Sequence, residues 1–304
     1  MAEISIGDAV GAGFGLIRRR PGAVLLWGLV ETAMVGLTVA ALMPMYAMMV
    51  AQMAQAKTGG APVVPNVAAI LPYQMLSYLL NFVGLFVLSV LNCAIFRCLV
   101  HPDRSSFGGL RLGATELLFA VLTIGAYIAF FIALLIVTIP AVIIIGVLSA
   151  VHAGVVAAIV GVAFGAAAVW AAVYAALRLS MVGPMMVDDG KVHITDAWAL
   201  TKGKAGSLFL IALGLVAVII VLELIGLAVV GALGFGAVSV IAGGEQAIPA
   251  LFKQPLPAVL ARLAPLIAAG GLLLIPLYGA VVAIMGAPWA RAYLDLRHNP
   301  ADAF

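Results

Sequence analysis

Six long runs of apolar residues dominate the chain, and shorter polar segments separate them. A helix needs about 20 apolar residues to cross the hydrocarbon core of a bilayer. We therefore predict an all-α, polytopic helical bundle with six transmembrane helices, over residues 22–52, 68–99, 114–150, 154–182, 207–241 and 266–290. A run of about 30 residues is roughly 45 Å long, so these helices must tilt, kink or project beyond the membrane. Four or eight spans are the alternatives, and six fits the charge pattern best.

Two of the polar segments resemble each other and each leads into an apolar run. Residues 6–10 (Ile-Gly-Asp-Ala-Val) match residues 194–198 (Ile-Thr-Asp-Ala-Trp), and a basic cluster and a glycine follow in both copies. Ile194, Ala197 and Trp198 fall on one face at helical spacing. We predict amphipathic interfacial helices over residues 1–21 and 186–206, with Ser5 as the N-cap of the first.

The spans pair into three hairpins, over residues 22–99, 114–182 and 207–290, and a polar tail follows over residues 291–304. Each hairpin ends in one arginine: Arg97, Arg178 or Arg291. We interpret this as a threefold repeat of one hairpin preceded by a cytoplasmic interfacial segment, of which residues 107–112 are the most degraded copy. The alternative is that spans of any membrane protein with basic cytoplasmic ends tend to finish in arginine.

Composition supports a membrane protein with a single integral domain over residues 1–304. Hydrophobic residues make up 65% of the chain and charged residues 9%, and the mean hydropathy is +1.26. Soluble domains carry roughly 45–50% apolar and about 25% charged residues. A water-soluble core of this size could not cover so much apolar surface. The basic residues lie at the ends of the spans, which argues against nucleic acid as a partner.

The distribution of basic residues predicts the orientation. Placing both termini in the cytoplasm leaves Lys57, Lys253 and Arg262 outside. The remaining 12 of the 15 basic residues are then cytoplasmic: Arg18, Arg19, Arg20, Arg97, Arg104, Arg111, Arg178, Lys191, Lys202, Lys204, Arg291 and Arg297. Cytoplasmic loops carry the excess of lysine and arginine in membrane proteins. We therefore expect both termini to be cytoplasmic and the number of spans to be even.

Two acidic residues lie within predicted spans and are the candidates for an intramembrane polar site. Glu31 lies in the first span and Glu223 in the fifth. Acids at membrane depth are costly and usually face a protein interior or a water-filled cavity. One interpretation is a proton-coupled or cation-coupled site, or a clamp for a cationic headgroup. The other is an acid, protonated or paired, that orders helix packing.

The three arginines at the hairpin ends, Arg97, Arg178 and Arg291, are candidates for contacts with lipid headgroups, and simple anchoring is the alternative role. No catalytic residue is predicted, because the sequence contains no nucleophile motif and no paired carboxylates. The four histidines are isolated in sequence and no ligand spacing appears, so no metal site and no cofactor are predicted. The segment Asp188-Asp189-Gly190-Lys191 predicts a turn.

Four stretches carry a resemblance to a family: residues 4–22, 178–189, 196–206 and 291–297. The chain resembles bacterial six-helix inner-membrane proteins that are related to the membrane domain preceding the catalytic domain in some glycerophosphoryl diester phosphodiesterases. The resemblance extends over nearly the whole chain. It implies a membrane module linked to envelope or lipid homeostasis and carries over no catalytic residues, because the soluble phosphodiesterase domain is missing from this chain.

These observations favour a non-enzymatic scaffold or interaction module of the bacterial inner membrane. Its expected partners are membrane lipids and another membrane protein or a second copy of the chain. The alternative is a small transporter or lipid-handling protein that uses Glu31 and Glu223 within a cavity. An intramembrane enzyme is the third hypothesis and would require several polar side chains to converge within hydrogen-bonding distance.

Overall fold

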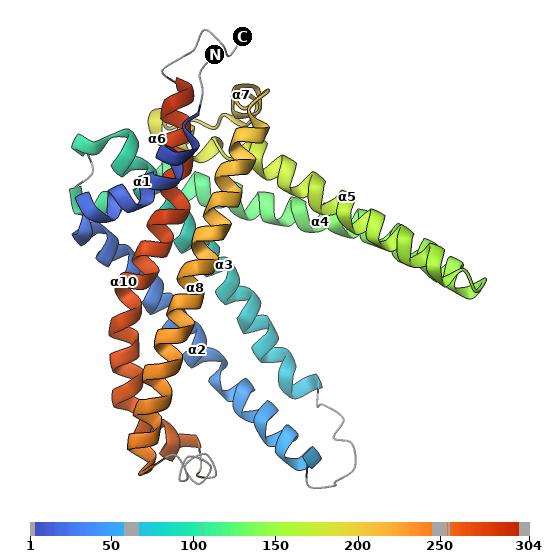
Figure 1. The fold of residues 1–304 in the computed structure, drawn as a ribbon, viewed down its shortest axis with the longest axis vertical. Helices are drawn as coiled ribbons and strands as arrows, with labels where there is room; N and C mark the ends of the chain where they lie inside the picture. The colour runs from blue at the N-terminus through green and yellow to red at the C-terminus, as the bar shows by residue number, and fades with distance from the viewer. Residues whose placement is uncertain (1–3, 58–66, 105, 245–253, 255, 298–304) are drawn as a thin grey trace. The chain divides into compact units, whose positions relative to one another are not determined.

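The computed structural model describes residues 4–57, 67–104, 106–244, 254 and 256–297 (Figure 1). Over these residues the protein is all-α and contains no strand. The α-helices are α1 (Ile6–Arg19), α2 (Pro21–Lys57), α3 (Val67–Val100), α4 (Ala114–Ala150), α5 (Gly154–Leu179), α6 (Val182–Asp189), α7 (Ile194–Leu200), α8 (Ala205–Ala242) and α10 (Leu256–Arg297). Two short 3-10 helices, η1 (Pro102–Arg104) and η2 (Ser106–Gly109), lie between α3 and α4.

Six of the helices are long and apolar enough to cross a membrane, namely α2, α3, α4, α5, α8 and α10. The predicted fold class is therefore confirmed, and the chain is a multi-pass membrane protein. Proline interrupts neither α2 at Pro44 nor α4 at Pro140, since both helices continue through these residues. Pro21 is the first residue of α2, where a missing N–H costs little.

The chain divides into two compact units. The first unit contains residues 1–13, 88–213 and 286–304, and the second contains residues 14–87 and 214–285. In the second unit, α2 and α10 approach each other so closely that a Cβ at Gly28 would meet the carbonyl oxygen of Ile275, and a Cβ at Gly279 would meet that of Val24. Only glycine permits such backbone contact between two spans.

The first unit contains the polar side chains described below and has its own apolar core. Its fully buried side chains include Leu91, Ile95, Met181, Met186 and Leu208. In this unit α4 and α5 run side by side as a helical pair, joined by a turn at His152 (Figure 1). Because α4 and α5 are adjacent in sequence and antiparallel, the turn at His152 lies at the opposite end of the pair from the start of α4.

The start of the chain forms a helix, as predicted. The helix α1 begins one residue after Ser5, whose hydroxyl accepts a hydrogen bond from the backbone N–H of Asp8 at 3.3 Å. This is the capping interaction expected of Ser5, and it satisfies one of the four N–H groups left without a partner at a helix start. The predicted N-cap is therefore confirmed.

The structure breaks the single helix predicted over residues 186–206 into two. The helix α6 ends at Asp189 because Gly190 adopts a left-handed conformation, with φ of 77°. The backbone N–H of Lys191 then donates to the Asp189 side chain at 2.9 Å, which confirms the predicted turn. The short helix α7 follows, and a second left-handed glycine, Gly203 with φ of 76°, separates it from α8.

The segment before α4 also differs from a regular interfacial helix. It contains the two 3-10 helices, and Phe107 and Gly109 have φ values of 54° and 73°. A Cβ at Gly109 would meet the carbonyl oxygen of Ala94, so only glycine fits this close approach to α3. Residues 107–112, the most degraded copy in the predicted repeat, therefore belong to a compact turn that packs on the end of α3.

Candidate functional site

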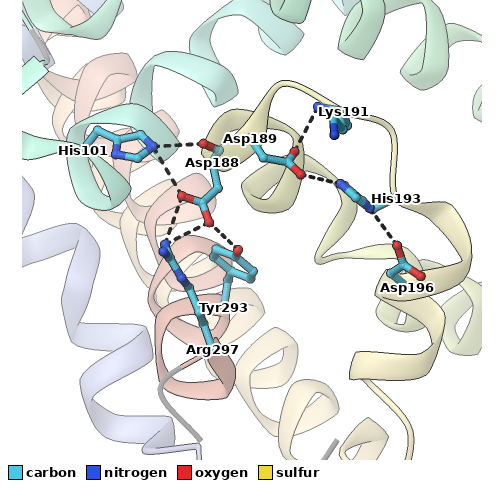
Figure 2. Close-up of polar contacts among 8 residues, drawn as sticks. All are labelled: His101, Asp188, Asp189, Lys191, His193, Asp196, Tyr293 and Arg297. Atoms are coloured by element: carbon cyan, nitrogen blue, oxygen red, sulfur yellow. Dashed lines mark hydrogen bonds and ion pairs between the residues drawn. The ribbon is translucent and has the colours of Figure 1, made fainter. Parts of the chain in front are cut away.

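In the first unit, Asp188 near the end of α6 contacts side chains at the ends of two other helices, α3 and α10 (Figure 2). The Tyr293 hydroxyl donates to Asp188 Oδ2 at 2.7 Å, and the Arg297 guanidinium lies 2.9 Å from Oδ1 and 2.8 Å from Oδ2. His101 Nε2 lies 3.3 Å from the Asp188 carbonyl oxygen and 3.4 Å from Oδ1. We call His101, Asp188, Tyr293 and Arg297 the Asp188 cluster. A carboxylate with this many donors is held in a fixed place.

The Asp188 cluster brings together residues from three distant parts of the chain. His101 directly follows α3, Asp188 lies in α6 just after α5, and Tyr293 and Arg297 lie in the last turns of α10. These elements end the second, fourth and sixth apolar helices. The three helix ends therefore lie together in the described structure.

A second group of charged side chains lies next to this cluster and depends on His193 (Figure 2). His193 Nδ1 lies 2.7 Å from Asp196 Oδ2, and Nε2 lies 2.6 Å from Asp189 Oδ2. The hydrogen bonds to Asp196 and Asp189 raise the pKa of His193 above its ordinary value. Both ring nitrogens can donate only when the imidazole is protonated. The arrangement therefore favours the protonated form of His193 between two carboxylates.

The predicted lipid contact Arg97 is engaged inside the protein. Its guanidinium donates to the carbonyl oxygen of Gly109 and pairs with the carboxylate of Glu116. The backbone N–H of Gly113 donates to the other carboxylate oxygen at 3.0 Å. The side chains of Arg97 and Glu116 are only 11% and 3% exposed. The pair therefore joins the end of α3 to the start of α4.

Arg178, at the end of α5, is also buried, but no carboxylate among the described residues pairs with it. The residue is 4% exposed, and its guanidinium lies 4.8 Å from the centre of the Trp198 ring and 6.0 Å from that of Tyr174. Its Nε is buried without a hydrogen-bond partner. Removing a charge from water costs several kcal/mol, whereas a cation–π contact returns about 0.5–2 kcal/mol. The aromatic rings alone do not offset the burial of this cation.

The third predicted arginine has a conventional surface position. The Arg291 side chain is 44% exposed and lies 3.2 Å from the carboxylate of Asp295, one turn further along α10. Exposed pairs at this spacing contribute about 0.3–0.5 kcal/mol. Arg97, Arg178 and Arg291 therefore have three different environments, although each ends a hairpin in the sequence.

The two predicted intramembrane acids lie in the second unit, where no hydrogen bond or ion pair among its described residues joins them. Glu31 lies within α2 and is partly buried, and Glu223 lies within α8 and is exposed. The polar residues that the described structure brings together are therefore different ones. Glu116 and the spacing Asp189, His193, Asp196 were not singled out as sites from the sequence.

An apolar groove of about 550 Å³ runs between α4 and α5. Phe130, Leu134, Phe164 and Val173 are among its lining residues, and no ionisable side chain lines it. Among the described residues, no group of three or more His, Cys, Asp or Glu side chains is placed to hold a metal ion. The groove therefore has the character of a lipid-facing or helix-facing surface, and Thr138 is the one polar side chain among its lining residues.

Comparison with protein-family models, curated proteins and solved structures finds no match for the chain. The resemblance to bacterial six-helix inner-membrane proteins therefore stays a prediction. The function has to be argued from the geometry of the described residues.

Proposed function

We propose that the protein is a non-enzymatic scaffold or interaction module of a bacterial inner membrane, linked to envelope or lipid homeostasis. The observation that carries this proposal is the Asp188 cluster. Its side chains bond to one another across three helix ends, so they stabilise an assembled face of the protein. A transport or catalytic site would instead direct such groups toward a cavity.

The orientation in this proposal has both termini in the cytoplasm. The Asp188 cluster supports it, because Arg297 and the turn containing Lys191 lie on the same side as the ends of α3 and α5. The excess of basic residues then faces the cytoplasm. The bacterial inner membrane is proposed from the resemblance of the sequence stretches named above.

The surface proposed to meet a partner is α7, which lies beside the Asp188 cluster. Ile194 and Trp198 are about half exposed on this short helix, whereas Ala197 and Thr201 are buried against the protein. A benzophenone amino acid introduced at Ile194 and activated in native membranes should give a discrete protein adduct. The same probe at Val155, at the far end of α5, is the matched control and should give none.

Proton flux separates this proposal from a coupled transporter. In proteoliposomes with an imposed pH gradient, the wild-type chain and the variants Glu31→Gln and Glu223→Gln should dissipate the gradient at the same rate as empty vesicles. The proposal is wrong if the wild-type chain dissipates the gradient faster and either substitution abolishes the difference. It is equally wrong if the probe at Ile194 yields no protein adduct.

A lipid-handling role is the second candidate, because Arg178 favours it. Among the described residues this buried cation has no carboxylate partner, and its place at the end of an apolar helix suits an anionic headgroup. This role is compatible with the scaffold, and binding of an anionic phospholipid tests it separately.

A further inference from the structure

Arg178 differs from the other two arginines at hairpin ends in what balances its charge. Arg97 pairs with Glu116, and Arg291 pairs with Asp295. No hydrogen bond or ion pair joins the Arg178 guanidinium to any residue in the described part of the chain. Because buried charges in proteins are paired, Arg178 needs an anion from another source.

The carboxylates closest in sequence to Arg178 are already engaged by other groups. Asp188 accepts from Tyr293 and Arg297. Asp189 and Asp196 both bond to His193. Relocating any of these carboxylates to Arg178 would leave another charged or polar group without its partner. These three carboxylates are therefore not free to pair with Arg178.

Aromatic side chains lie beside the Arg178 guanidinium. Trp198 lies at 4.8 Å and packs nearly perpendicular to Tyr174, with an angle of 83° between the two rings. Tyr174 in turn stacks on Trp170, with ring centres 5.5 Å apart. The N–H groups of a guanidinium point outward in its plane and match two oxygens of a phosphate.

The turn after α7 adds positive charge to the same neighbourhood. The Thr201 hydroxyl lies 3.0 Å from the carbonyl oxygen of Arg178, which anchors the turn over residues 201–204 to the end of α5. Lys202, in this turn, is exposed. Trp170, Tyr174 and Trp198 are also partly exposed, as aromatic side chains are where a membrane meets water.

We propose that Arg178, framed by Tyr174 and Trp198, binds a phosphate group. The phosphate comes from an anionic phospholipid headgroup or from a soluble phosphate. The terminal N–H groups of the guanidinium donate to its oxygens, and Lys202 contributes long-range attraction. This site goes beyond the proposed scaffold function and does not depend on it, since lipid binding and partner crosslinking are measured separately.

Native mass spectrometry of the purified full chain tests the site and its ligand source. The detergent-solubilised protein is titrated with phosphatidylglycerol, with diacylglycerol, which has no phosphate, and with inorganic phosphate. The site predicts binding of phosphatidylglycerol over diacylglycerol. If inorganic phosphate competes at equal concentration, the source is soluble phosphate. If it does not, the source is the lipid. Equal binding of phosphatidylglycerol and diacylglycerol, without any bound phosphate, overturns the proposal.

Substitutions then assign the binding to Arg178. Arg178→Gln should weaken phosphate-dependent binding about tenfold, because hydrogen bonds to a charged group are lost. Arg291→Gln is the matched control and should bind as the wild type does, since Arg291 already pairs with Asp295. Unchanged binding by Arg178→Gln, or an equal loss in both variants, contradicts the assignment.

A second variant keeps the test decisive if Arg178→Gln does not fold. Arg178→Lys retains the charge but lacks the planar set of donors. It should fold and bind phosphatidylglycerol more weakly than the wild type, at a level above that of diacylglycerol. Wild-type binding by Arg178→Lys would show that the geometry of the guanidinium plays no part, and would overturn the proposal in this form.

Discussion

The two ends of the α4–α5 helical pair differ in their polar contacts and in the burial of their side chains. At one end, Glu116 pairs with Arg97, and α6 packs on the rings of Phe96 and Phe119. At the other end, apolar side chains such as Val155 point outward and are exposed, on either side of a turn at His152. The comparison shows that apolar content provides the spans, whereas the unique arrangement depends on polar and close-packed contacts at one end.

The largest expected effect comes from breaking the buried ion pair at the polar end. Glu116→Ala leaves the Arg97 guanidinium buried without its carboxylate, which costs about 3–5 kcal/mol of unfolding free energy. Unfolding of the purified protein by denaturing detergent measures this loss. Val155→Ala, at the far end, is the control and should change the free energy by less than about 0.5 kcal/mol. Similar losses at both ends would remove the distinction.

The next effect comes from the Asp188 cluster. Asp188→Ala removes the acceptor of Tyr293 and Arg297, and hydrogen bonds involving a charged group contribute about 1.5–3 kcal/mol. The same unfolding measurement should show a loss in this range. Tyr293→Phe removes one of the bonds and should lose a smaller part. A neutral Asp188→Ala variant would mean that the three helix ends are held together by other contacts.

Two glycine positions test the difference between the two ends through packing alone, without any change in charge. A Cβ at Gly183 would lie 2.5 Å from the Phe96 ring and 3.0 Å from the Phe119 ring, whereas a Cβ at Gly165 in α5 meets nothing within 4 Å. Gly183→Ala should therefore destabilise the protein by about 1–3 kcal/mol. Gly165→Ala should leave it unchanged or stabilise it by up to about 1 kcal/mol, because alanine favours helix. The thermal midpoints of the two variants should move in opposite directions or differ clearly.

The smallest effect is the pH dependence of His193. Its raised pKa favours the protonated form in the folded state. The resulting stabilisation is present in full below the ordinary value of about 6.5, and it is lost as the pH rises through the raised pKa. Because the site is partly exposed, the effect should stay below about 1 kcal/mol.

Thermal midpoints of the wild type and His193→Gln, measured at acidic and alkaline pH, test this effect. The wild type should be the more stable of the two at acidic pH, and the difference should vanish at alkaline pH. In the double variant Asp189→Asn, Asp196→Asn, the His193→Gln substitution should have no pH-dependent effect. A difference that grows toward alkaline pH would contradict the assigned charge state.

Much of the fold could be predicted from the sequence because bilayer thickness imposes long apolar runs. The six spans, the Ser5 cap and the turn after Asp188 all follow from local chemistry. A single helix was expected over residues 186–206, although the turn predicted at residues 188–191 falls inside it. Gly190 separates α6 from α7 at that turn, and Gly203 separates α7 from α8. An amphipathic pattern continues across a tight turn as easily as along one helix.

The sites were harder to predict because their contacts are distant in sequence. Asp188 and Arg297 are separated by 109 residues, and no local sequence pattern predicts their contact. Glu116 looks like an ordinary acid in the first turn of a helix, which is favourable by itself. The three arginines share one sequence position at a hairpin end. Only the structure distinguishes Arg97, which pairs with Glu116, from Arg178, which has no carboxylate partner among the described residues.

The central claim is that the polar end, where the ends of α3, α6 and α10 meet, forms one cytoplasmic face. Cysteine labelling tests it in a chain whose buried Cys93 and Cys98 are replaced by alanine. A single cysteine replaces either Lys202 at the polar end or His152 at the far end. In intact cells, a membrane-impermeant maleimide should label His152→Cys, and it should label Lys202→Cys only after the membrane is opened. Labelling of both positions from the same side would contradict the account.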